Sequence, residues 1–175
     1  MSVSLAGRGS AFEELLEYSH RTYANKHLAV VQKVAVPVKL TRERAAQGRG
    51  FVGYYAAKST VDFVGVYKDG RGVALDAKST RLKTRIKWDE SHFPRHQQDC
   101  LRAWARQGGL ALILVEFSVL GRYFAIHFEV WDAHQAPSWT VEQCATWGHL
   151  VQSGRGCPLD YLAPWTLPRH PEVAR

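Results

Sequence analysis

The chain has few cysteines and no long hydrophobic run. Three cysteines among 175 residues are odd in number and widely spaced, which fits reduced thiols better than a framework of disulfides. No apolar run approaches the ~20 residues that a membrane span needs. The first residues also lack the apolar core of a signal peptide. These absences predict a cytoplasmic protein with no membrane partner.

Several common functional motifs are also missing. The sequence contains no Walker loop, no G-x-S-x-G nucleophile motif and no dinucleotide fingerprint, so no small-molecule cofactor is expected. Methionine and asparagine each occur once. A low content of thermolabile residues is consistent with a hot environment, and a GC-rich genome would give the same bias.

Positive charge is in excess. The formal net charge is +7 and the isoelectric point is about 9.5, which favours an anionic partner, with nucleic acid first. The alternative is a generic basic protein that its charge keeps soluble. A hydrophobic content of 46% allows a real core, so we expect one domain over residues 1–165 and a flexible tail over 166–175.

The hydrophobic pattern predicts an α/β fold, a mixed central β-sheet flanked by helices. Helices are expected at 11–24, 94–107 and 140–148, the first with Ser10 as its N-cap and Glu13 completing a capping box. Strands are expected at 27–40, 59–67, 73–79, 110–117 and 122–131. The basic, aromatic segment 41–58 has no clear period, and we expect it to project as a hairpin or stalk. Irregular structure is expected at 80–93 and 149–175.

Three charged residues stand inside apolar stretches of two neighbouring predicted strands. Asp62 lies in the first strand, and Asp76 and Lys78 lie in the second, after a tight turn at Asp69-Gly70. Side chains two residues apart on a strand share a face, so Asp76 and Lys78 point to the same side. If the two strands pair through the turn, Asp62 and Asp76 can converge on one point.

Two convergent carboxylates form a hard-oxygen site that suits Mg²⁺, an ion that uses one or two carboxylates and keeps several waters. A lysine beside them adds positive charge where a phosphate and its attacking water would sit. A metal ion lowers the pKa of bound water and stabilises charge in phosphoryl transfer. The spacing therefore indicates a phosphodiester hydrolase. The alternative is a surface hairpin with ordinary charges, and the Val, Leu, Phe and Ala around the acids argue against it.

Asp62 followed by Asp76-Ala77-Lys78 resembles the signature of the PD-(D/E)xK nuclease superfamily. Over roughly residues 7–165, the sequence resembles the RecU-type Holliday junction resolvases. The segments that carry this resemblance are, in order, GRGSAFEELLE, VQKVAVPVKL, STVDFVGVY, LDAKST, HFPRHQQD and PLDYL. The chain has Asp76 where these resolvases more often have Glu, and the shorter side chain implies a metal ion nearer the strand.

The resemblance implies a restriction-endonuclease-like fold, a homodimer with a projecting stalk, and Mg²⁺ as cofactor with Mn²⁺ as its substitute. The implied metal ligands are Asp62, Asp76 and the backbone carbonyl of Ala77. Lys78 would orient the attacking water or stabilise the transition state. The other catalytic candidates that the resemblance implies are Glu13 on the first helix, Gln97 and Thr60.

Basic and aromatic residues supply candidates for contact with DNA. The tripeptide GRG occurs four times, and its glycines let the backbone approach a phosphate while its arginine adds charge. Three basic residues alternate just after the predicted site and could follow a phosphate backbone. Tyr54 in the stalk could stack on unpaired bases at a branch point. The alternatives are ordinary turns and a solvated face for the basic residues, and packing in the stalk or in a dimer interface for Tyr54. The candidates are Arg8, Arg42, Arg44, Arg49, Tyr54, Arg71, Lys83, Arg85 and Lys87.

The sequence thus predicts a Mg²⁺-dependent endonuclease, a homodimer that resolves four-way DNA junctions by paired symmetric nicks. A second interpretation is a nuclease of the same fold that cuts ordinary duplex DNA in repair or restriction. A third is a module that binds branched DNA without cutting it, and the joint presence of Asp62, Asp76 and Lys78 argues against that.

Overall fold

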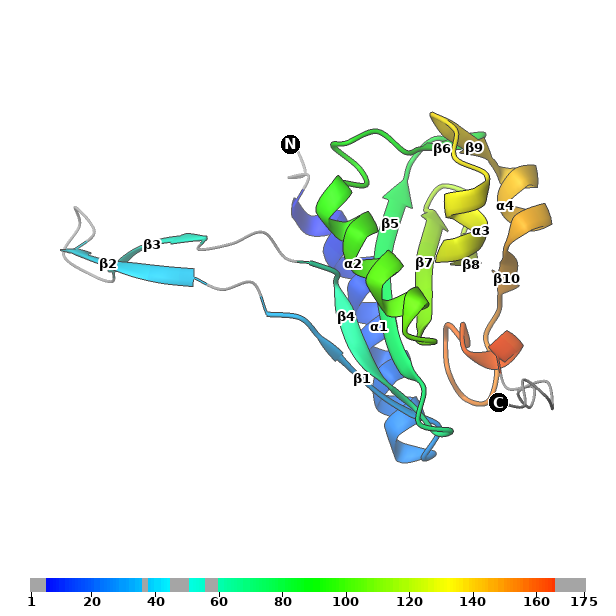
Figure 1. Cartoon of the computed structure of the whole chain (residues 1–175), viewed down its shortest axis with the longest axis horizontal. Coiled ribbons are helices and arrows are strands. Elements are labelled where there is room, and N and C mark those ends of the chain that lie inside the picture. The colour runs from blue at the N-terminus through cyan, green and yellow to red at the C-terminus, as the bar shows by residue number, and fades with distance from the viewer. Residues whose placement is uncertain (1–5, 36–37, 45–50, 56–59, 166–175) are drawn as a thin grey trace.

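The computed structural model describes residues 6–35, 38–44, 51–55 and 60–165, and its centre is a six-stranded sheet (Figure 1). In spatial order the strands are β1 (Ala29–Lys33), β4 (Phe63–Tyr67), β5 (Gly72–Thr80), β7 (Leu110–Phe117), β8 (Arg122–His127) and β10 (His149–Val151). The β5–β7 pair is parallel and the other pairs are antiparallel. The predicted mixed sheet flanked by helices is therefore confirmed.

The centre of the sheet is buried on both faces. Every residue of β7 is buried, as the unbroken apolar run in this segment predicts. Helix α2 (Arg95–Arg106) connects β5 to β7, because two parallel strands cannot be joined by a tight turn and need a crossover. Strands 73–79 and 110–117 and the helix between them are confirmed, within a few residues at their ends.

Two separate layers cover the sheet. Helix α1 (Ala6–Asn25) packs on one face through Phe12 and Leu16. The other face carries α2, α3 (Phe128–Ala133) and α4 (Val141–Trp147), together with the short antiparallel pair β6 (Arg85–Lys87) and β9 (Ser138–Thr140). The two layers form separate hydrophobic clusters, so the charged residues of β5 lie between two cores.

Two helix predictions have different outcomes. The first helix begins at Ala6 and includes Ser10, so Ser10 is not its N-cap and the prediction of 11–24 is too short. Packing outweighs the unfavourable helix propensity of the early glycines, since Phe12 stacks on Tyr123 at 5.6 Å. Helix α4 has the predicted position, and its capping box joins Thr140 and Gln143.

The predicted strand 27–40 is wrong, because it contains parts of two strands in different sheets. β1 belongs to the central sheet, whereas β2 (Val38–Arg44) pairs with β3 (Phe51–Tyr55) in a separate antiparallel ribbon that extends away from the sheet (Figure 1). The apolar alternation continues through both strands, so the pattern does not reveal the change of sheet. The expected projecting hairpin is present, and it begins earlier than residue 41.

Other strand boundaries also differ from the predictions. β4 begins at Phe63 rather than at residue 59, so Asp62 lies in the bend before the strand. The predicted strand 122–131 ends at His127, and α3 follows it. Phe128 and Trp131 are both buried at helical spacing, a period that is hard to recognise inside an aromatic run. The predicted loop 80–93 contains β6.

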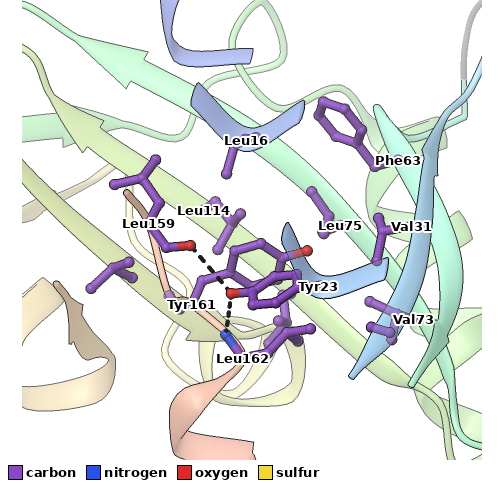
Figure 2. Close-up of a cluster of buried hydrophobic side chains, with 14 of the residues drawn as sticks. Leu16, Tyr23, Val31, Phe63, Val73, Leu75, Leu114, Leu159, Tyr161 and Leu162 are labelled. Carbon is purple, nitrogen blue, oxygen red and sulfur yellow. Dashed lines mark hydrogen bonds between the residues drawn. The ribbon is translucent and has the colours of Figure 1, made fainter. Parts of the chain in front are cut away.

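The prediction of an irregular segment after residue 149 is wrong for its first part. β10 pairs with β8, and the residues of the PLDYL segment pack under α1. In Figure 2 the hydroxyl of Tyr23 donates to the carbonyl of Leu159 and accepts from the amide of Leu162, both at 3.2 Å. Buried Asp160 forms an ion pair with Arg155. The predicted flexible tail, 166–175, lies outside the described residues, and the domain limits stay a prediction.

Two expectations drawn from absences can be compared with the structure. Cys100, Cys144 and Cys157 are all free thiols, as the spacing of the cysteines suggests. Within the described ranges, no helix has both the length and the apolar character needed to cross a membrane.

The buried His20 makes the stability of the fold depend on pH. His20 is 5% exposed, accepts or donates one hydrogen bond with the Tyr161 hydroxyl at 3.0 Å, and has its pKa lowered by burial from 6.5 to about 4. Between about pH 6.5 and pH 4, His20 is protonated in the unfolded chain and stays neutral in the folded protein. Stability is therefore lost as the pH falls from 6.5 toward 4, by about 2 kcal/mol at pH 5 from this residue alone.

His20→Gln should remove that part of the pH dependence, because glutamine does not titrate. The measurement is urea unfolding at pH 7 and pH 5, with His27→Asn as the control, since His27 is exposed and asparagine tolerates its φ of 53°. We expect the control to retain the wild-type loss. An equal loss in His20→Gln and wild type would contradict the explanation.

Candidate active site

The three charged residues singled out in the sequence meet at the carboxyl end of β5, the end at which the β5 arrow points in Figure 1. Asp76 and Lys78 share one face of this strand, as the period of two predicts. Asp62 lies in the bend that leads into the neighbouring β4, and its Oδ2 accepts a hydrogen bond from the backbone amide of Ala77 at 2.7 Å. Asp62 thus reaches β5 from a bend and not, as expected, from a strand face.

Asp76 is a fully buried acid whose oxygens are poorly satisfied. Its side chain has no exposed surface, and its Oδ2 lies 2.6 Å from the ammonium nitrogen of Lys78. Apart from this ion pair and the neighbouring Asp62 carboxyl group, which lies close enough to share a hydrogen bond with Asp76, no hydrogen bond reaches either carboxylate oxygen within the described residues. A buried carboxylate normally has its lone pairs filled, so a further cationic partner would satisfy carboxylate oxygens that the protein leaves without a full set of hydrogen bonds.

Burial raises the pKa of both acids. The pKa of Asp76 is raised to about 7 by burial, although Lys78 lowers it, and the neighbouring Asp62 raises it further. The pKa of Asp62 is also raised by burial. The hydrogen bond from the Ala77 amide and the charge of Lys78 lower it by less than burial raises it. Two acids that compete for a proton in a buried site are stabilised as carboxylates by a cation between them.

Lys78 is fixed by partners from two elements. Besides Asp76, its Nζ donates to the Oε1 of Gln97 at 2.8 Å, and the Lys78 side chain is only 12% exposed. Gln97 lies in the first turn of α2, close enough to β5 to contact Lys78. The structure therefore brings Gln97 into the candidate site.

Glu13 lies beside the site rather than inside its hydrogen-bond network. Its charge raises the pKa of Asp62, and its Oε2 lies 2.6 Å from the Nζ of Lys33 on β1. Sequence reasoning missed Lys33, which also lies 3.5 Å from Glu17. Thr60 lies in an exposed bend and does not share a strand face with Asp62, because β4 begins later than expected.

The basic strip after the site is exposed. Lys83 lies in the loop after β5, and Arg85 and Lys87 lie on β6 with the buried Ile86 between them. The two β6 residues therefore point to solvent on one face, as their alternation suggests. Thr80, at the end of β5, donates to the carbonyl of Arg85 at 3.4 Å, which holds this strip next to the site strand.

Arg71 does not lie at the site. It follows the turn at the opposite end of β5, where its Nε lies 2.7 Å from Asp69 and its Nη2 donates to the carbonyl of Trp165 at 3.0 Å. The guanidinium also lies 5.5 Å from the ring centre of Tyr67. These contacts give Arg71 a structural role in holding the turn and the end of the described chain.

The remaining DNA-contact candidates are distributed over other elements. The backbone of Arg8 lies in the first turn of α1, and the ribbon that projects from the sheet carries three more candidates on β2 and β3. Arg49 lies outside the described residues. The three candidates on the ribbon are Arg42, Arg44 and Tyr54.

Sequence reasoning also missed two residues that contact the site strand. The ring of buried Phe93 lies 5.3 Å from Lys78 Nζ, and no signal in the sequence links these two residues. Glu116 on β7 accepts a hydrogen bond from Ser79 at 2.5 Å and is 8% exposed. Here a signal exists, because Glu116 is an acid within the apolar run of a buried strand.

The arrangement fits a magnesium ion. The described residues contain no group of three or more His, Cys, Asp or Glu side chains that could hold a metal ion. The candidate ligands are therefore the two carboxylates, Asp62 and Asp76, and the backbone carbonyl of Ala77. This set suits Mg²⁺, which takes few protein oxygens and keeps several waters, better than ions that need a cage of side chains.

A mixed sheet flanked by helices, with Asp62, Asp76 and Lys78 close together where two adjacent strands meet, is consistent with a nuclease-like fold. The model of the family described as "Recombination protein U" matches residues 7–165. The chain belongs to the RecU family.

Similar proteins cover most of the chain. One from Streptococcus sanguinis is 31% identical in an alignment that covers 91% of this chain and 74% of that protein. One from Geobacillus thermodenitrificans is 29% identical in an alignment that covers 93% of this chain and 85% of that protein. One from Lactobacillus helveticus is 28% identical in an alignment that covers 91% of this chain and 78% of that protein. Each of these three proteins is named Holliday junction resolvase RecU.

Lys78→Met should destabilise the metal-free protein by about 3 kcal/mol at pH 8, because it leaves Asp76 buried without its cationic partner. The double variant with Asp76→Asn should regain most of this loss, since neither charge is then buried. Guanidinium unfolding in EDTA measures both effects.

Lys33→Met is the control for that experiment. Lys33 also forms an ion pair, but its side chain is 51% exposed, so its loss should change the free energy of unfolding by no more than about 1 kcal/mol. Equal stability of Lys78→Met and wild type would mean that the buried pair does not contribute to the fold.

Proposed function

We propose that this protein is a Mg²⁺-dependent endonuclease that resolves four-way DNA junctions, acting as a homodimer that makes paired symmetric nicks. The observation that carries the proposal is the buried carboxylate of Asp76, whose oxygens are poorly satisfied beside Asp62 and Lys78. Membership of the RecU family, with relatives named Holliday junction resolvases, supports the choice of substrate.

The site residues have different roles in the proposed hydrolysis of the phosphodiester bond. When bound, Mg²⁺ supplies Lewis-acid stabilisation of the phosphoryl oxygens and a more acidic water, and Mn²⁺ can do the same. Asp62 and Asp76 would hold the ion, together with the carbonyl of Ala77. Lys78 places its ammonium group where negative charge develops on the phosphate as water attacks in line and the 3′ oxygen leaves.

The position of Lys78 is set before the substrate arrives. Its Nζ lies between the Oδ2 of Asp76 at 2.6 Å and the Oε1 of Gln97 at 2.8 Å, so little reorganisation is needed during the reaction. Gln97, which lies in the first turn of α2, accepts the hydrogen bond from the Lys78 ammonium group. The same helix also covers β5. A lysine held in this way contributes charge at a defined point, which a free surface lysine does not.

Junction specificity comes from shape and from backbone contacts. Arg85 and Lys87 present positive charge on one face of β6 close to the site, and contacts of this kind position a duplex without reading its sequence. The β2–β3 ribbon extends from the body (Figure 1) and is the element that would reach the branch point. A two-fold dimer matches the reaction, because two symmetric strands must be cut.

Cleavage of a labelled immobile four-way junction, beside a linear duplex of matching sequence, tests the proposal. We expect paired symmetric nicks in the junction alone, with Mg²⁺ or Mn²⁺ and not with EDTA. Equal cutting of both substrates would replace the proposal with a general nuclease. Tight binding of the junction without cleavage in Mg²⁺ or Mn²⁺ would replace the proposal with a module that binds branched DNA and does not cut it.

Asp76→Asn should lower the rate of junction cleavage by at least about 10²-fold, because the amide cannot hold the cation that stabilises the developing charge. The affinity for the junction in EDTA should stay unchanged, since it depends on basic surface residues. Gel-shift and single-turnover assays give both values.

The control for this variant is Glu142→Gln, which removes one negative charge from the exposed start of α4. It should retain the wild-type rate, because none of the contacts of Asp62, Asp76 or Lys78 involves Glu142. A wild-type rate for Asp76→Asn would show that the site has been wrongly assigned.

A further inference from the structure

The ammonium group of Lys78 lies over the face of an aromatic ring. Its Nζ is 5.3 Å from the ring centre of Phe93, within the distance at which a cation is attracted to the negative face of an aromatic ring. Phe93 has no exposed surface, so water competes little for the ammonium on that side. Asp76, Gln97 and Phe93 therefore surround Lys78 with a carboxylate, an amide oxygen and a ring.

Phe93 itself is held by other aromatic rings. The ring of Trp131 packs edge-on against it at 4.8 Å and 79°, and the ring of Trp88 lies at 5.9 Å. Trp88 also packs edge-on against Trp139 of β9 at 5.8 Å. These contacts come from α3, β9 and the loop after β6, so the ring of Phe93 cannot turn away without moving several elements.

The backbone of Phe93 is fixed as well. Its amide donates to the carbonyl of Asp89 at 2.8 Å, and its carbonyl accepts from the Nε2 of Gln98 at 2.8 Å. Pro94 follows as the N-cap of α2, and Gln97 lies in the first turn. One short, rigid segment therefore supplies two of the three groups that contact the lysine.

We propose that Phe93 is a positioning residue for Lys78, and that the aromatic cluster formed by Phe93, Trp88, Trp131 and Trp139 serves to hold that ring in place. This inference rests on the proposed function, in which Lys78 stabilises the charge that develops on the phosphate. The reason is that lysine has a long, flexible side chain with an ammonium group that binds without a preferred direction. Without the ring, only the ion pair with Asp76 and the hydrogen bond to Gln97 restrain the ammonium group.

Fluorination of the Phe93 ring tests this role with almost no change in its shape. Each added fluorine withdraws electron density from the ring face and weakens its attraction for a cation. With one, two and three fluorines placed at position 93, the single-turnover rate of junction cleavage should fall stepwise, to about tenfold below wild type for the last. Junction affinity should stay unchanged.

The same series at Phe117 is the control. Phe117 is as fully buried and packs edge-on against Phe124 at 5.9 Å, so fluorination there should leave the cleavage rate unchanged. A rate that is independent of fluorination at position 93, or an equal fall in both series, would overturn the proposal.

A second measurement does not depend on activity. In EDTA, the methylene protons beside the Lys78 ammonium should resonate upfield because of the Phe93 ring, and Phe93→Leu should return them to the usual lysine range. An unshifted signal in the wild type would overturn the positioning contact even if junctions are cut. Failure of the wild type to cut any junction, with the shifted signal present, would overturn the proposed function and leave the contact between Phe93 and Lys78 established.

Discussion

The structure depends on one costly interaction, the burial of the Asp76 carboxylate toward the carboxyl end of β5, one of the central strands of the sheet. A buried acid lowers stability unless its charge is compensated, and here Lys78 is the protein group that compensates it, at 2.6 Å. The pKa of about 7 at Asp76 is the sign that this compensation is incomplete. We propose that a bound cation completes the compensation of this buried charge.

The surrounding elements bring further groups to the ion pair of Asp76 and Lys78. The parallel β5–β7 pairing requires a crossover, and the crossover helix α2 delivers Gln97 to the ammonium group. The bend before β4 brings in Asp62 through the Ala77 amide. The opposite face is closed by α1 and by the chain after β10, where Tyr23 bonds to the backbone around Asp160 (Figure 2). Each layer thus restrains one side of the strand that carries the site.

The sequence predicts the site better than it predicts the outer parts of the fold. Asp76 and Lys78 stand out because charged residues are rare inside apolar strands, and the hairpin signal at Asp69-Gly70 places a second acid next to them. Local patterns cannot show that the chain changes sheets between β1 and β2, or that the PLDYL segment packs under α1, since both depend on contacts distant in sequence. The contact between Phe93 and Lys78 is of the same kind.

The central claim is that Asp62 and Asp76 together bind a divalent cation. Isothermal titration of the DNA-free protein with Mn²⁺ at pH 8 tests it without reference to cleavage. We predict saturable binding by the wild type, lost in Asp76→Asn. Equal binding by the variant and the wild type, or no binding by the wild type, would contradict it.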